Sequence, residues 1–173
     1  MLESAGIVFC CLCRIFTGHL YEWCGGDLLG VLFGSVNNSV WEQNKTTLLA
    51  YFLWGIIEIL LLQHAMKRLT VAKTASLYCT GLLLTGGSML NGGWIVCIVS
   101  LIVSAGFSTV LFTSSLNLKG LFAPCLFLLL LFLAFYFCFT PFPPHLRLFE
   151  DPQTHFYGII PPYIDKGAAI LSN

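Results

Sequence analysis

The stretch LFLLLLFLAFYFCF, from Leu126 to Phe139, decides what kind of fold this chain adopts. It holds no charged residue, and with the apolar residues before it the run reaches the roughly 20 residues that a helix needs to cross a bilayer core. Soluble strands and core helices are usually interrupted sooner by polar residues. The stretch therefore predicts a membrane-spanning helix.

The composition of the whole chain agrees with this prediction. Of its 173 residues, 57% are hydrophobic and only 9% are charged, whereas soluble domains carry about 25% charged residues. The formal net charge is zero, and no basic run is present that would neutralise a series of phosphates. Nucleic acid is therefore excluded as an expected partner, and the lipid bilayer is the expected one.

The sequence predicts an all-α transmembrane bundle over residues 1–140 with about five spans. The segments of sufficient length are about 5–24, 46–66, 72–90, 94–116 and 121–140. Segment 28–36 is apolar but too short to span, so we expect an interfacial helix there. Six of the seven prolines lie after residue 140, and residues 141–173 are expected to form a mostly non-helical tail packed over the outer face.

The distribution of basic residues predicts the orientation. Glu3 and Arg14 argue against a cleavable signal peptide, so the first helix is expected to be retained. The basic residues of the expected loops 67–73 and 117–120 fall on the N-terminal side. The positive-inside rule then places the N-terminus in the cytoplasm and the C-terminus outside the cell membrane. Loop 25–45 and the tail share one face in either orientation.

Two opposite charges lie inside the expected spans. Arg14 in the first span and Glu58 in the second are at similar depths in antiparallel neighbours, counted at 1.5 Å per residue. A lone charge at such a depth costs several kcal/mol, so a partner is expected. The sequence predicts an intramembrane ion pair between Arg14 and Glu58, either structural or part of an ion relay.

Polar and aromatic residues gather at the expected outer face. The candidates for a binding cluster are His19, Tyr21, Glu22, Trp23, Asn37, Trp41, Glu42, His145 and Asp151. Structural roles are the alternative: Ser39 and Glu42 match a helix capping box, and the aromatics match an interfacial belt. The eight cysteines fall mostly in apolar runs, which favours buried free thiols. The sequence indicates no metal and no cofactor.

Three segments at this face resemble a known group of proteins. HLYEW at 19–23, NNSVWEQNK at 37–45 and FTPFPPHLRLFEDPQTHFYG at 139–158 resemble an uncharacterised family of small bacterial multi-pass membrane proteins. The family's second segment usually reads closer to N-E-S-x-W-E-H, so Asn38 and Gln43 stand where that family has an acid and a histidine. The resemblance implies a membrane protein and no particular activity, and this departure argues against a metal.

Three classes of function remain open. The chain binds or transports a small ligand or lipid at its outer face, as a monomer or a homo-oligomer. Alternatively it is a membrane enzyme acting on a lipid headgroup, with His145 as acid or base and Glu22 or Glu42 as its partner. A third possibility is a structural subunit whose outer residues dock a partner.

Overall fold

The computed structural model describes residues 2–89 and 93–159. Within these ranges the secondary-structure elements are all helices. A single bridge between Glu150 and Tyr157 is the exception. The helices are α1 (Leu2–Trp23), α2 (Leu28–Phe33), α3 (Val40–Leu61), η1 (Gln63–Ala65), α4 (Met66–Ser88), α5 (Gly93–Thr113), η2 (Leu118–Leu121) and α6 (Phe122–Cys138). The all-α fold is confirmed.

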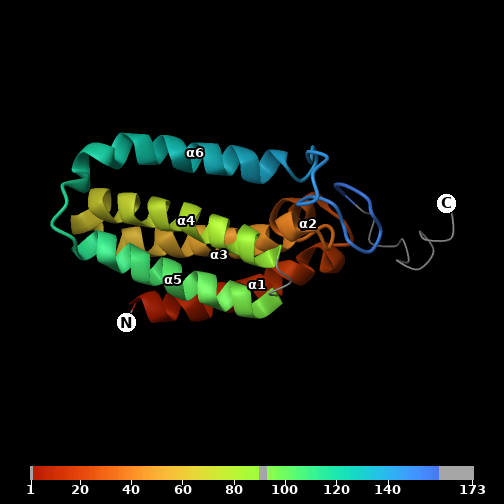
Figure 1. Cartoon of the computed structure of the whole chain (residues 1–173), viewed down its shortest axis with the longest axis horizontal. Coiled ribbons are helices and arrows are strands. Elements are labelled where there is room, and N and C mark those ends of the chain that lie inside the picture. The colour runs from red at the N-terminus through yellow and green to blue at the C-terminus, as the bar shows by residue number, and fades with distance from the viewer. Residues whose placement is uncertain (1, 90–92, 160–173) are drawn as a thin grey trace.

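The five long helices run up and down beside one another (Figure 1). Helix α4 contacts α3, α5 and α6, and α1 contacts α3 and α5. The N-terminus, η1 and η2 lie at one end of the bundle, while α2 and the segment after α6 lie at the other (Figure 1). We call this second end, which contains residues 24–39 and 139–159, the loop end.

Each of the five expected spans corresponds to a long helix, but several boundaries differ, most of all the starts of α3 and α4. Helix α3 begins at Val40, six residues before the expected start, because the Ser39 hydroxyl caps it by accepting a bond from the Glu42 amide at 3.3 Å. Helix α4 begins at Met66, so the basic residues expected in a loop at 67–73 lie within a helix. Residues 90–92, between the third and fourth expected spans, and the tail beyond residue 159 lie outside the described residues.

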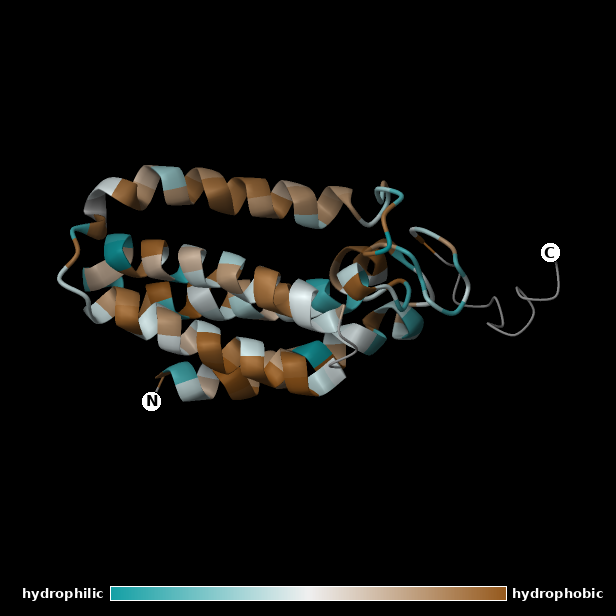
Figure 2. Cartoon of the chain, in the orientation of Figure 1, coloured by the Kyte–Doolittle hydropathy of each residue, from teal (hydrophilic) through white to brown (hydrophobic). Residues whose placement is uncertain are grey.

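The core is apolar, and so is much of the outer surface. Tyr51, Trp54, Leu84 and Tyr136 are among the buried residues between the helices. Figure 2 shows that α5 and α6 consist largely of apolar residues. Many of these residues are exposed; Ile95 on α5, for example, is 75% exposed. Of the described helices, α1, α3 and α5 are long and apolar enough to cross a membrane; α6 is apolar but shorter.

Candidate functional site

An open polar cleft of about 280 Å³ lies at the loop end, where α1, the start of α3 and the start of α5 meet. Polar side chains from separate parts of the chain converge there. Its lining consists of Arg14, Ile15, Gly18, His19, Ser35, Asn38, Gln43, Thr46 and Trp94. The cleft is wide enough for a small ligand or for part of a lipid headgroup.

Arg14 is the charged group of the cleft. Its Nη1 donates a hydrogen bond to Thr47 Oγ1 at 2.6 Å, and its guanidinium carbon lies 4.9 Å from the centre of the Trp94 ring. Such stacking is the usual cation–π geometry. Among the described residues, no carboxylate oxygen lies within 4 Å of the guanidinium.

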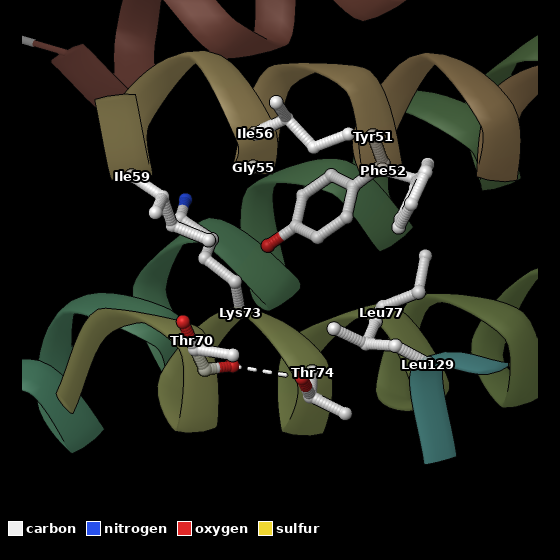
Figure 3. A pocket seen from close by; sticks show the side chains of 10 residues that line it. All are labelled: Tyr51, Phe52, Gly55, Ile56, Ile59, Thr70, Lys73, Thr74, Leu77 and Leu129. Atoms are coloured by element: carbon white, nitrogen blue, oxygen red, sulfur yellow. Dashed lines mark hydrogen bonds between the residues drawn. The ribbon is translucent and has the colours of Figure 1, made fainter. Parts of the chain in front are cut away.

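The expected ion pair between Arg14 and Glu58 is therefore not formed. Glu58 pairs with Lys73 of α4, and Lys73 also contacts Glu3 of α1 at 2.8 Å. The reason is the position of Lys73: it lies on a buried helix face rather than in the expected loop. In Figure 3 it reaches towards α3 beside the Tyr51 ring, next to a cavity of about 40 Å³.

Only His19 of the expected outer cluster lines the cleft. Its Nδ1 lies 3.8 Å from Glu22 Oε2, and its ring stacks on Trp23. All three side chains are exposed at the end of α1. Tyr21 instead turns inward, where its backbone packs closely on Gly30 and Gly34.

Glu42 belongs to a buried polar interlock rather than to the cleft. Its Oε2 lies 2.7 Å from Lys45 Nζ and accepts a bond from the Val36 amide, while its Oε1 accepts a bond from the Thr140 hydroxyl at 2.9 Å. Lys45 also donates to Thr140 Oγ1 at 2.8 Å. Both carboxylate oxygens are thus engaged, which joins the start of α3 to the end of α6.

Three more of the expected cluster residues take part in contacts that join residues 141–159 to residues 37–41. Asn37 donates to the Gly158 carbonyl at 2.8 Å. Asp151 is fully buried and accepts a bond from the Asn38 amide. The Trp41 amide donates to the Leu148 carbonyl at 2.9 Å. These contacts are structural, and only Asn38 is shared with the cleft lining.

His145 lies apart from both acids that the enzyme hypothesis pairs with it. Its exposed ring packs on Tyr157 with centroids 4.9 Å apart. Next to it, His155 Nδ1 lies 2.7 Å from Glu150 Oε1. This hydrogen bond from His155 holds the pKa of the Glu150 carboxyl below its ordinary range.

Sequence reasoning missed most of the cleft. It found His19, but it assigned Arg14 to an ion pair and gave no role to Ser35, Thr46 or Trp94. Within residues 2–89 and 93–159, no three His, Cys, Asp or Glu side chains gather as metal ligands do, and the cysteines there are free thiols.

Comparison with known proteins gives one match. A protein-family model, described as a family of unknown function (DUF6512), matches residues 2–159. No curated protein and no solved structure matches the chain.

Proposed function

The chain belongs to DUF6512, a family of unknown function, and from its own residues we propose that it is a multi-pass membrane protein that binds or transports a small ligand or lipid in the cleft at the loop end. The observation that carries the proposal is the cleft itself. Polar groups of α1, α3 and the 34–39 loop line an open concave space of about 280 Å³, and small-molecule sites are concave with a few convergent polar groups.

The exposed apolar surface supports the membrane location. A helix of a soluble bundle shows a polar stripe towards water, whereas Ile95, Val110 and Phe127 are all more than 60% exposed on α5 and α6. Lipid is the solvent that accommodates such a surface without cost. Because Lys67 and Arg68 lie near the end opposite the loop end, the positive-inside rule favours a loop end outside the cell.

The interlock supports a binding role for the neighbouring cleft. Glu42, Lys45 and Thr140 fix the start of α3 against the end of α6. The start of α3 also supplies Gln43 and Thr46 to the cleft. A wall held by buried bonds keeps its shape before a ligand arrives, which lowers the cost of binding.

Filling the cleft tests the proposal. A Cβ added at Gly18, which lines the cleft, meets no atom within 4 Å, so Gly18→Leu places a side chain in the space without a clash at its first carbon. Gly106→Leu is the matched control, because Gly106 is equally open but lies on the outer face of α5.

The protein is purified in mild detergent, and its co-purifying small molecules and lipids are identified by native mass spectrometry. We expect one species to be retained by the wild type and by Gly106→Leu but lost from Gly18→Leu. If Gly18→Leu and the wild type retain the same species in equal amounts, the cleft is not the binding site.

A further inference from the structure

The charge of the cleft indicates the class of its ligand. Resting on the proposed binding function, we infer that the cleft binds an anionic group, a phosphate or a carboxylate, with Arg14 as the residue that holds it. The source of the group is either an anionic lipid headgroup or a soluble anion, and the chemistry of recognition is the same for both.

The first argument is that the buried Lys45 and Lys73 have carboxylate partners, whereas the half-buried Arg14 has none among the described residues. Half-buried Arg68 also lacks a described carboxylate, but it bonds to the backbone carbonyls of Leu111 and Phe112. Lys45 lies 2.7 Å from Glu42, and Lys73 contacts both Glu3 and Glu58. No described carboxylate lies within 4 Å of Arg14. A bound anion would supply the missing negative charge.

The second argument is the way in which Arg14 is held. Thr47 and the Trp94 ring fix the guanidinium from two directions. The hydrogen bond to Thr47 uses one of the five N–H donors that an arginine offers. A positioned guanidinium with further donors facing a cleft is suited to bidentate contacts with phosphate or carboxylate oxygens.

The third argument is the chemistry of the remaining lining. Besides Ile15, Gly18 and Trp94, it consists of neutral hydrogen-bonding groups and an imidazole, supplied by Ser35, Asn38, Gln43, Thr46 and His19, and no described carboxylate lines the cleft. The Ser35 and Thr46 hydroxyls already donate to backbone carbonyls, so Arg14 is the principal donor available to an anion. Glu22 lies 3.8 Å from His19 on the exposed end of α1 and is not part of the lining, and Asp151 is buried against the Asn38 amide.

The fourth argument is energetic. Arg14 lies nine residues before the end of α1 at Trp23, or roughly 14 Å along the helix axis. An arginine without a counter-charge is unfavourable at such a depth in a bilayer, which is why intramembrane charges normally have partners. An anion entering through the cleft lowers this cost, and the gain adds to its binding free energy.

The test compares Arg14→Gln, which removes the charge, with Arg14→Lys, which keeps the charge but loses the planar fork. Arg147→Gln is the matched control, since Arg147 is exposed and lies outside the cleft. Arg14→Gln removes a cation that no described carboxylate neutralises, so we expect its melting temperature in detergent to be no lower than that of the wild type.

Binding is measured in two arms. In the first arm, native mass spectrometry records retention of an anionic phospholipid against a zwitterionic one in mixed nanodiscs. In the second, thermal shift titrations use inorganic phosphate and acetate in neutral detergent. We expect at least a tenfold weaker affinity in Arg14→Gln, an intermediate affinity in Arg14→Lys and no change in Arg147→Gln. Binding in the first arm alone identifies a lipid headgroup, and binding in the second identifies a soluble anion.

The outcomes separate this inference from the proposed function. If Gly18→Leu abolishes retention of a ligand that Arg14→Gln still binds with wild-type affinity, the cleft is a binding site but the anion inference is wrong. If neither variant changes any ligand, both the inference and the proposed function are wrong. A retained ligand without an anionic group also overturns the inference.

Discussion

Glu58 of α3 and Lys73 of α4 form an ion pair that is almost fully buried: 2% of the surface of Glu58 and 5% of that of Lys73 are exposed. Glu3 of α1 is the second partner of Lys73 at 2.8 Å. One lysine therefore connects three helices. Its removal leaves two carboxylates close together, whereas removal of Glu58 leaves Lys73 paired with Glu3.

This asymmetry gives the first prediction. Breaking a buried ion pair by removing one partner costs about 3–5 kcal/mol because a buried charge is left uncompensated. We expect Lys73→Met to destabilise the protein by about that amount, and Glu58→Gln to cost less because Glu3 remains. Reversible unfolding in mixed micelles measures both; a larger loss in Glu58→Gln would contradict the three-helix arrangement.

The second prediction concerns the interlock at Thr140. Its hydroxyl donates to Glu42 and accepts from Lys45. In Thr140→Val the buried Glu42 carboxylate therefore loses a donor, and the buried Lys45 ammonium loses an acceptor. We expect a loss of about 1–3 kcal/mol and faster hydrogen exchange in residues 141–159. The control is Thr113→Val, because the exposed Thr113 hydroxyl bonds only to carbonyls of its own helix. Equal exchange in both variants would count against the interlock.

The third prediction concerns the contact of α2 with α1. A Cβ added at Gly34 would lie 2.8 Å from the Tyr21 amide nitrogen and 2.5 Å from the Gly30 carbonyl oxygen, and backbone atoms do not move aside easily. We expect Gly34→Ala to cost about 1–3 kcal/mol through overpacking. Gly18→Ala is the control, since nothing lies within 4 Å of its added carbon. Thermal unfolding compares the two, and an equal stability would show that α2 is not packed in this way.

The fourth prediction is a pH dependence in the segment after α6. The His155 hydrogen bond lowers the pKa of Glu150 in the folded protein below its ordinary value of 4.5. A carboxyl with a depressed folded pKa contributes stability that is present above its ordinary pKa and is lost as the pH falls through the folded value. We expect protease cleavage within residues 150–157 to accelerate as the pH falls below about 4.5, measured with an acid-active protease.

Glu150→Gln provides the comparison for this experiment. The glutamine variant lacks the titrating carboxyl, so its cleavage rate should change less over the same pH range. The contribution is small because the carboxyl is at the surface, where solvent screens it. An identical acid response in the variant and the wild type would show that another group controls this segment.

Much of the architecture follows from the sequence alone. The apolar runs predicted all five long helices. Because successive spans run in opposite directions, five of them predicted that residues 25–45 and the segment after α6 lie at the same end, as Figure 1 shows. The pairing of Ser39 with the Glu42 amide is a local capping interaction, and local interactions are readable from spacing. The second span was expected to begin only at residue 46 because residues 42–45 are polar or charged, and the sequence does not show that this first turn of α3 is largely buried.

The tertiary structure alone decided the partners of the charges. A helix that is apolar on every side has no polar stripe to show which face turns inward, so the sequence could not orient Arg14, Glu58 or Lys73. Depth along the helix suggested that Arg14 meets Glu58, but rotation about the helix axes directs Glu58 to Lys73 and Arg14 to Thr47 and the cleft. The sequence determined how far along each helix a charge lies, and only packing of the helices determined the side on which it finds its partner.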